Sequence, residues 1–439
     1  MKTITQTCHA MQTILGPVSD QLGWATGFTR RQSKMSGSAF VQTMVFGGMG
    51  NADLTYTNLR SGAKNTGVDI TNQGLEQRFT VASAALCQRV LEEAVRQVII
   101  PEPTALPLLA RFAGVYIRDS SVISLPNELE EVWSGGANQH CERAGLKLQV
   151  RLEICSGQLA GPVLRAAREN DAKSPFQNEF LPPGAVRMGD LGFFSIKQFV
   201  EDQRHLVFWF SRYKAGTLLY DEQGQTIDLL GWLHTQKLDQ SECTIYLDEK
   251  EHLACRLLAE RVPPAVVEQR KRKLNDYART KQTPVTAELL ALAEWTLIIT
   301  NIPVSLLTIP EAIVLLHVRW QIELLFRWWK SLLKVDEWRS QKPWRILTEL
   351  YAKLIAVVII HWIFLVRLWQ YPDRSQWKAV LIIRRFANAL ALALPDLVTL
   401  EQVLSQLHDH FRSICHINPR RKHPNTCQRL ANPLCITLP

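Results

Sequence analysis

A segment before the middle of the chain alternates apolar and polar residues with the period of a β-strand. Its apolar members are Leu146, Leu148, Val150, Leu152 and Ile154, and charged or amide residues fill the positions between them. A period of two places the two sets of side chains on opposite faces of a sheet, so these residues predict a strand. Residues 159–164 are the expected partner strand.

Further patterns extend this strand into a larger sheet. More strands are predicted at residues 114–119, 185–188, 205–210 and 295–300, with a helix at 195–202. Several strands followed by a helix and another strand indicate a mixed α/β sheet. The sequence Thr308-Ile-Pro-Glu311 is a capping box with proline in the first turn, which predicts that a long helix begins there.

Composition places the chain among globular proteins. Its 439 residues suffice for roughly two to four domains. With 46% apolar and 21% charged residues, it can bury a large core and is not dominated by disorder. A formal charge of +9 suits a polyanionic partner. The scattered cysteines include no C-x-x-C pair and the start has no secretory apolar core, so we expect reduced thiols and a cytoplasmic protein.

The most apolar run, residues 354–366, could be mistaken for a membrane span. Its thirteen residues are interrupted by His361, and a spanning helix needs about 20 apolar residues. We therefore predict a buried helix and no membrane partner. Membrane association through this run is the alternative, which recovery of the protein without detergent would exclude.

Two short helices are expected near the N-terminus, at residues 51–61 and 71–78, around a turn that holds Gly67 and Asp69. Thr71 or Asn72 could cap the second helix. The pattern fits a helix-turn-helix, which would place a helix in the major groove of DNA. An ordinary helical pair fits it equally well.

The helix that follows Thr308 carries one carboxylate among several cations. At 100° per residue, Glu323, Arg327 and Lys330 fall within about 80° of Arg319, on one stripe of the helix. A glutamate flanked by cations in this way looks like an acidic ligand set in a phosphate-binding face. The alternative is an ordinary charged stripe facing solvent.

Two aspartates stand at matching places in the predicted strands. Asp119 lies on the strand at 114–119, and Asp190 follows the strand at 185–188 within a glycine-flanked turn. Together with Glu323 they can converge at one edge of a sheet and hold two Mg²⁺ or Mn²⁺ ions, which prefer oxygen ligands. Such ions stabilise both oxygens of a phosphodiester displacement. Considered alone, each aspartate is more often an ordinary edge or turn residue.

The chain resembles a known family in four segments that follow one another in order. They are similar to the first-aspartate block, the second-aspartate block, the segment that follows it and the Tyr-x2-Arg-x3-Glu-x6-Lys signature of the insertion-sequence-four group of DDE transposases. In this chain they are Tyr116-Ile-Arg-Asp119-Ser-Ser, Gly189-Asp190-Leu-Gly192-Phe-Phe, Phe210-Ser-Arg-Tyr-Lys214 and Arg319-x3-Glu323-x6-Lys330. One position departs from the group, because Leu316 stands where the signature has tyrosine.

The resemblance implies a ribonuclease-H-like mixed α/β sheet with a mostly β insertion before the last catalytic helix. It implies an N-terminal helical DNA-binding region at 1–105 and a catalytic core at 106–212 and 295–370. The mostly β insertion would occupy 213–294, and a helical, basic C-terminal region would occupy 371–439.

The resemblance also implies a function, that of a cut-and-paste DNA transposase. Asp119, Asp190 and Glu323 would be the catalytic ligands of two Mg²⁺ or Mn²⁺ ions. Arg319 and Lys330, with Arg327 beside them on the stripe, would bind DNA. The partners would be double-stranded DNA at the transposon ends and at the target, and a second copy of the chain. The protein would be prokaryotic and associated with the nucleoid. A catalytically inert DNA-binding relative is the alternative that Leu316 leaves open.

In this group an aromatic side chain of the insertion commonly holds the end DNA. Trp232 and Trp295 are the candidates for stacking on a base. Packing in the core is the favoured alternative for both.

Overall fold

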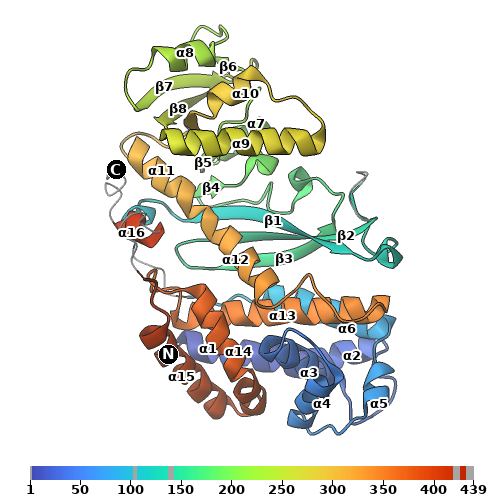
Figure 1. The fold of residues 1–439 in the computed structure, drawn as a ribbon. Coiled ribbons are helices and arrows are strands. Elements are labelled where there is room, and N and C mark those ends of the chain that lie inside the picture. The colour runs from blue at the N-terminus through green and yellow to red at the C-terminus, as the bar shows by residue number, and fades with distance from the viewer. Residues whose placement is uncertain (1, 102–105, 137–142, 419–425, 432–439) are drawn as a thin grey trace. The chain divides into compact units, whose positions relative to one another are not determined.

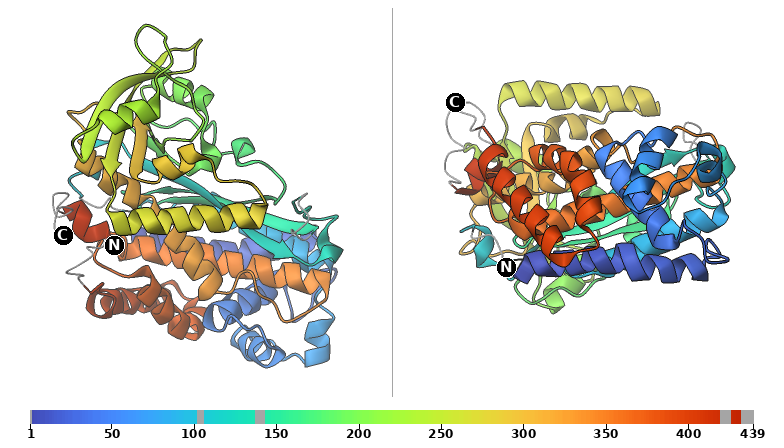
Figure 2. Two further views of the ribbon diagram at one scale, coloured as in Figure 1. Left: turned by 45° about the horizontal axis from the view of Figure 1, so that its top comes forward. Right: turned by 90° about the horizontal axis from the view of Figure 1, so that it is seen from below.

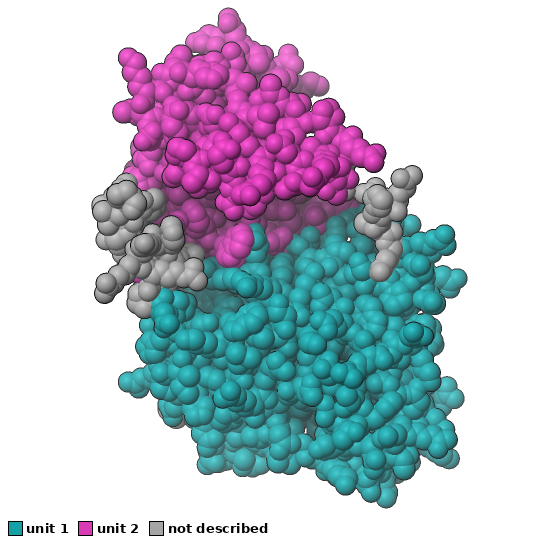
Figure 3. Space-filling view, viewed as in Figure 1, with its two compact units in different colours: residues 1–105, 120–169, 321–421 teal, residues 106–119, 170–320, 422–439 magenta. Residues whose placement is uncertain are grey.

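The computed structural model describes residues 2–101, 106–136, 143–418 and 426–431, and the chain divides into two compact units (Figure 3). Unit 1 comprises residues 1–105, 120–169 and 321–421, and unit 2 comprises residues 106–119, 170–320 and 422–439. Strand β1 (Val115–Leu125) and helix α12 (Trp320–Ser331) each contribute residues to both units.

The strands form a mixed sheet in the order β3-β2-β1-β4-β5-β9-β8-β7-β6. The pairs β1–β4 and β4–β5 are parallel, whereas β2–β3, β5–β9, β8–β9, β7–β8 and β6–β7 are antiparallel. The predicted mixed α/β class is therefore confirmed. The remaining strands are β2 (Ala144–Glu153), β3 (Leu159–Ala166), β4 (Val186–Met188), β5 (Phe208–Arg212), β6 (Leu219–Tyr220), β7 (Gln240–Leu247), β8 (Leu253–Arg261) and β9 (Trp295–Thr300).

The predicted partnership of the alternating segment is confirmed in unit 1, where β2 pairs antiparallel with β3. The polar members of the alternation are nevertheless buried as well, since Lys147 is 7% and Gln149 is 1% exposed. The Lys147 ammonium offsets part of that cost by donating a hydrogen bond to the Glu169 carbonyl at 2.5 Å. Both faces of β2 are therefore covered.

The helices of unit 1 come from the two ends of the chain and lie side by side in Figures 1 and 2. Helix α13 is central among them and packs against α6 and α3. The helices are α1 (Lys2–Thr13), α2 (Ser19–Ala25), α3 (Gly37–Gly50), α4 (Tyr56–Asn65), α5 (Asn72–Glu76), α6 (Val81–Arg96), α13 (Pro343–Arg367), α14 (Gln376–Ala393) and α15 (Leu397–Ile414), with a short π-helix at Ile14–Val18 and a 3-10 turn at Asn127–Leu129.

Helix α13 contains the apolar run of the sequence and is long and apolar enough to cross a membrane. All of its most apolar window is buried inside the protein, as in a core helix. One of its buried polar groups, the Lys353 ammonium, donates to the carbonyls of Lys334 and Glu337 at 2.9 and 2.7 Å. The predicted buried helix is confirmed.

His361 on α13 gives unit 1 a pH-dependent stability. Burial lowers the pKa of His361 to about 4, although Nε2–H donates to the Gly157 carbonyl at 2.6 Å. An unfolded histidine titrates near 6.5, so the unfolded chain takes up this proton first as the pH falls. Stability present above pH 6.5 is therefore lost as the pH falls towards 4, by roughly 3 kcal/mol in total.

We expect the midpoint of urea unfolding to fall over that window, and the His361→Gln variant to show a weaker fall. Glutamine can still donate to the Gly157 carbonyl but does not titrate. The two proteins, compared at pH 7, 5.5 and 4, separate the His361 contribution from that of the carboxylates. Parallel curves would contradict the assignment.

The helical pair predicted near the N-terminus exists as α4 and α5. Thr71 caps α5 by accepting a hydrogen bond from the Gly74 amide, as one of the two predicted caps. However, α5 has only five residues and ends at Glu76, earlier than predicted. A helix of that length offers little more than one turn to a groove, so the ordinary helical pair describes these residues better.

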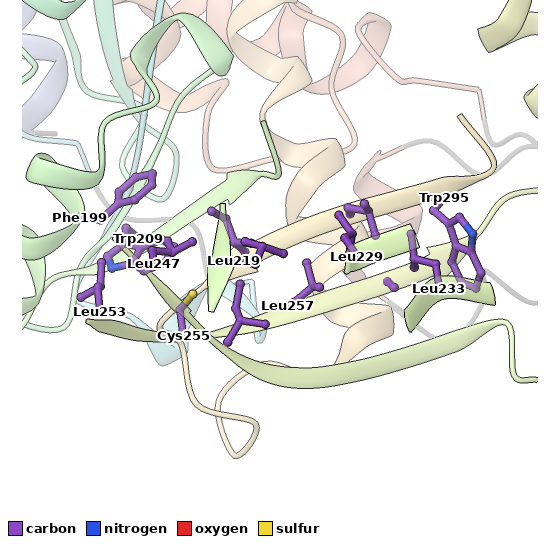
Figure 4. Packing of buried hydrophobic residues seen from close by; sticks show 14 of the residues in the cluster. Phe199, Trp209, Leu219, Leu229, Leu233, Leu247, Leu253, Cys255, Leu257 and Trp295 are labelled. Atoms are coloured by element: carbon purple, nitrogen blue, oxygen red, sulfur yellow. The ribbon is translucent and has the colours of Figure 1, made fainter. Parts of the chain in front are cut away.

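Unit 2 is built around an apolar cluster between β5, β7, β8 and β9 on one side and α7 (Ile196–Arg204) and α8 (Leu229–Thr235) on the other (Figure 4). Trp209 is fully buried and stacks on Phe199 with ring centroids 4.3 Å apart. The further helices of this unit are α9 (Pro264–Lys281), α10 (Ala287–Leu292), α11 (Ile309–Val318) and α16 (Thr426–Ala431), with 3-10 turns at Leu109–Arg111, Asp171–Lys173 and Leu191–Phe193.

Residues 213–294 are more helical than the expected mostly β insertion, because α8, α9 and α10 hold more residues than β6, β7 and β8. Helix α9 begins with Pro264, whose fixed φ suits a first helical position. Arg270 anchors it by donating to the carbonyl of Trp295 at 2.8 Å and to the Thr296 hydroxyl at 2.9 Å. The basic run thus begins with a structural arginine.

The long helix predicted from Thr308 is present but divided. It begins with the predicted capping box between Thr308 and Glu311. It is interrupted at Arg319, which separates α11 from α12. Two residues before the break, His317 Nδ1 lies 2.6 Å from the Ile313 carbonyl, and a side chain bonded to that carbonyl perturbs the helical ladder.

Candidate functional site

Asp119 lies on β1, and Asp190 lies in the turn that follows β4, the neighbouring parallel strand in Figure 1. The register of β1 and β4 pairs Ile117 with Met188. Each aspartate follows its member of that pair by two residues, and both belong to unit 2. Adjacent strands are about 4.8 Å apart, so this register favours a close approach of the two predicted site residues.

The turn after β4 fixes the Asp190 carboxylate. Asp190 is the N-cap of the 3-10 turn at Leu191–Phe193, and its Oδ1 accepts a hydrogen bond from the Gly192 amide at 2.9 Å. A Cβ atom at Gly192 would lie 3.1 Å from that same Oδ1 and 3.3 Å from Asp171 Oδ2. Glycine therefore lets the turn close tightly around the carboxylate.

Asp119 is paired with the first cation of the predicted helix stripe. Arg319 Nη1 lies 3.8 Å from Asp119 Oδ2, and the two side chains are 15% and 12% exposed. A pair this well shielded from solvent interacts more strongly than a surface pair. Arg319, which the family resemblance predicts to bind DNA, thus lies beside one of the predicted metal ligands.

The other members of the stripe lie on α12 in unit 1. Lys330 donates from Nζ to the carbonyl of Val122 on β1 at 2.9 Å. The Arg327 guanidinium lies over the ring of Trp377 on α14, 5.7 Å from its centroid. Both cations therefore also have contacts within the protein, and Arg327 remains exposed.

Glu323 also belongs to unit 1, whereas Asp119 and Asp190 belong to unit 2. Among the described residues, no three histidine, cysteine, aspartate or glutamate side chains form a group that could hold a metal ion. Two of the three predicted ligands thus lie on or directly after neighbouring parallel strands, and the place of the third relative to them stays a prediction.

Buried arginines beneath the aspartates were not predicted from the sequence. Arg187 on β4 is 5% exposed, and its Nε donates to both carboxylate oxygens of Asp202 at 3.0 and 2.9 Å. Arg118 on β1 is 3% exposed, and burial together with the charge of Arg187 lowers the pKa of Arg118 to about 9. The sequence feature that could have identified these arginines is a charged residue inside each of two otherwise apolar strands.

The two tryptophans predicted to contact DNA pack in or against the apolar cluster of unit 2. Trp295 is 6% exposed within the apolar cluster of unit 2, where Figure 4 shows it beside Leu233. The Arg261 guanidinium lies 4.4 Å from the centroid of its ring. Trp232 packs against the same cluster and is partly buried. The favoured alternative, a core aromatic, is confirmed for Trp295.

The region of Leu316 is in contact with α16. His317, next to Leu316, lies with Nε2 3.1 Å from Arg429 Nη1. Nδ1 faces the Ile313 carbonyl, so Nε2 is the ring nitrogen that accepts from Arg429. Leu316 itself is partly buried. The leucine side chain has no hydroxyl that could replace that of the tyrosine in the family signature. The basic residues Arg420, Arg421 and Lys422 of the C-terminal region lie outside the described residues.

Comparison of the sequence with known proteins finds one family and several relatives. Residues 110–359 match the family model described as "Transposase DDE domain". The transposase of insertion sequence element IS231F from Bacillus thuringiensis subsp. israelensis is 26% identical over 366 residues, 77% of this chain and 76% of the relative. That of IS231B from Bacillus thuringiensis subsp. berliner is 23% identical and covers 92% of this chain and 89% of the relative. A piggyBac transposase synaptic complex with hairpin DNA gives a TM-score of 0.49 at 8% identity, over 95% of this chain and 86% of that one.

Proposed function

This chain belongs to the family of transposases with a DDE domain, and on that premise we propose that Asp119, Asp190 and Glu323 hold its divalent metal ions. The protein is an insertion-sequence transposase, an enzyme that cleaves DNA and transfers strands. Transposases of this family depend on divalent cations. The observation that supports the proposal best is the strand register, in which Ile117 pairs with Met188. Asp119 and Asp190 each follow one of these paired residues by two positions.

The donor set fits a hard cation. Both aspartates offer carboxylate oxygens, which Mg²⁺ and Mn²⁺ prefer over nitrogen or sulfur ligands. Asp119 and Asp190, with a third carboxylate from Glu323, would hold two such ions. When bound, such ions would activate water and stabilise the attacking and leaving oxygens of the phosphodiester.

The surrounding cations would hold the DNA strand against this site. Arg319 is already beside Asp119, and its planar guanidinium matches two phosphate oxygens at once. Its backbone keeps helical dihedral angles at the break between α11 and α12, so Glu323 follows it by about one helical turn. Lys330 and Arg327, on the same stripe, would contact neighbouring phosphates.

These features lead to the finer proposal of a cut-and-paste transposase of the insertion-sequence-four group. It would act on double-stranded DNA at the ends of its element, bridged by two copies of the chain, and then on target DNA in the prokaryotic nucleoid. The hydroxyl freed by the first cleavage would attack the next phosphodiester. We also propose that the chain has a ribonuclease-H-like catalytic core with an insertion before α12.

The departure at Leu316 gives a gain-of-function prediction. A tyrosine there would offer a phenolic O–H to a phosphate oxygen, and a hydrogen bond to a charged group contributes about 1.5–3 kcal/mol. We expect Leu316→Tyr to raise the rate of end cleavage by about 10–100-fold. Leu316→Phe, which adds the ring without the hydroxyl, is the matched control and should leave the rate near that of the parent. Equal rates in all three proteins would count against a phosphate at this position.

The proposed activity can be tested with DNA that carries the inverted repeats flanking the gene. The wild-type protein should nick this duplex with Mg²⁺, leave 3′-hydroxyl ends and join them to a plasmid. Chelation of the metal should stop cleavage without releasing the DNA. A protein that binds these ends but never nicks them, even with Mn²⁺, would be the inert relative instead.

A further inference from the structure

The turn that holds Asp190 packs against a buried arginine, Arg118, to which the proposed reaction assigns no role. Arg118 precedes Asp119 on β1, and successive side chains of a strand point to opposite faces. While Asp119 meets Arg319, the Arg118 guanidinium is enclosed on the other side of the strand and is 3% exposed. Burying a cation is costly unless its surroundings compensate, so its retention calls for an explanation.

The guanidinium of Arg118 binds main-chain oxygens from two loops. Its Nη1 donates to the carbonyls of Phe176 and Gln177 at 3.2 and 3.1 Å, and its Nη2 lies 3.4 Å from the carbonyl of Phe193. It also lies over the Phe193 ring, 5.0 Å from the centroid. Phe193 closes the 3-10 turn that Asp190 caps, so Arg118 holds that turn by its far end.

Gly189, between β4 and Asp190, shows how closely the turn fits onto this arginine. A Cβ atom there would lie 3.3 Å from Arg118 Nε and 3.2 Å from Phe193 Cβ. Arg187, one strand away, shares the Phe176 carbonyl at 3.2 Å. Arg187 pairs with the Asp202 carboxylate, whereas Arg118 donates its hydrogen bonds to backbone carbonyls. Its hydrogen bonds are therefore suited to fixing backbone.

We propose that Arg118 is a positioning residue that holds the Asp190 turn in register with Asp119, so that the aspartate pair is arranged for a divalent cation before the cation arrives. The inference rests on the proposed function of these aspartates. Replacing a residue that orients a metal ligand typically changes metal affinity by about 10–100-fold. Lysine is a poor substitute, because one ammonium on a flexible stem cannot span three carbonyls as a planar fork does.

The test is the affinity of the DNA-free protein for Mn²⁺, measured by calorimetry together with the unfolding temperature in the absence of metal. We expect Arg118→Met and Arg118→Lys each to weaken Mn²⁺ binding about tenfold or more. Gly189→Ala should also weaken Mn²⁺ binding, because the added methyl group displaces the turn while Arg118 remains intact. This variant provides the test if the arginine variants fail to fold.

Arg345→Met is the matched control. Arg345 is a buried arginine of unit 1, 6% exposed, that also donates to a carbonyl and lies over an aromatic ring. Its loss should lower the unfolding temperature and leave Mn²⁺ affinity unchanged. Wild-type affinity in Arg118→Met, or full affinity in Arg118→Lys or Gly189→Ala, would overturn the inference. Equal affinity in wild type and Asp190→Asn would instead overturn the proposed metal site, and the inference with it.

Discussion

Asp190→Asn and Asp119→Asn are each expected to lower the rate of metal-dependent end cleavage by about 10³-fold. Asparagine keeps the shape of the side chain but removes the charge that a divalent cation needs. A metal ion supplies several kcal/mol of transition-state stabilisation, and each ~1.4 kcal/mol is a factor of ten in rate. Binding to end DNA should persist, because phosphate contacts by cations supply most of that affinity.

A neighbouring carboxylate controls for the change of charge. Asp171 lies close to the same turn, since a Cβ atom at Gly192 would be 3.3 Å from its Oδ2. It is not among the proposed ligands, so Asp171→Asn should leave cleavage within about twofold of the wild-type rate. Cleavage is measured on labelled duplex ends, and binding by a mobility shift at fixed salt. Undiminished cleavage by Asp119→Asn would refute the assignment of that residue.

The second large effect concerns stability. Asp202 is 2% exposed and accepts hydrogen bonds from Arg187 and from Gln198 Nε2 at 2.9 Å. Removing one charge of a buried pair leaves the other uncompensated, which typically costs about 3–5 kcal/mol. We therefore expect Asp202→Asn to lower the free energy of unfolding by that amount and to loosen β4, from which the Asp190 turn begins.

The same helix provides the control for this prediction. Glu201, the preceding residue on α7, pairs with Arg204 at 2.7 Å, and these side chains are 43% and 58% exposed. An exposed pair contributes little, so Glu201→Gln should change the free energy of unfolding by less than about 1 kcal/mol. Urea unfolding of both variants compares a buried with an exposed ion pair on one helix. Similar midpoints would show that burial does not set the strength of the Asp202 pair.

Much of the sheet could be predicted because its signals are local. Strand β9 spans the predicted residues 295–300, and β3 pairs with the alternating strand as expected. The capping box at Thr308 fixes the start of α11, because its partners lie three residues apart. Asp190 could be singled out for the same reason, because the two glycines of its turn lie within two residues of it.

Other features depend on residues that meet only in the folded chain. The break at Arg319 accompanies a side-chain contact of His317, which helical periodicity does not reveal. The burial of Lys147 depends on Glu169, which lies beyond β3. Arg118 is a single charge in an apolar strand until the loops at 176–177 and 193 close around it. Such tertiary contacts override local pattern, and they surround the candidate site.

The most direct measurement would replace Mg²⁺ by Fe²⁺ and map where hydroxyl radicals generated at the bound ion cut the polypeptide. If Asp119, Asp190 and Glu323 share one metal site, cuts should cluster within a few residues of all three positions and disappear when excess Mg²⁺ competes. Cuts confined to the neighbourhoods of Asp119 and Asp190, or none that Mg²⁺ suppresses, would contradict a site completed by Glu323.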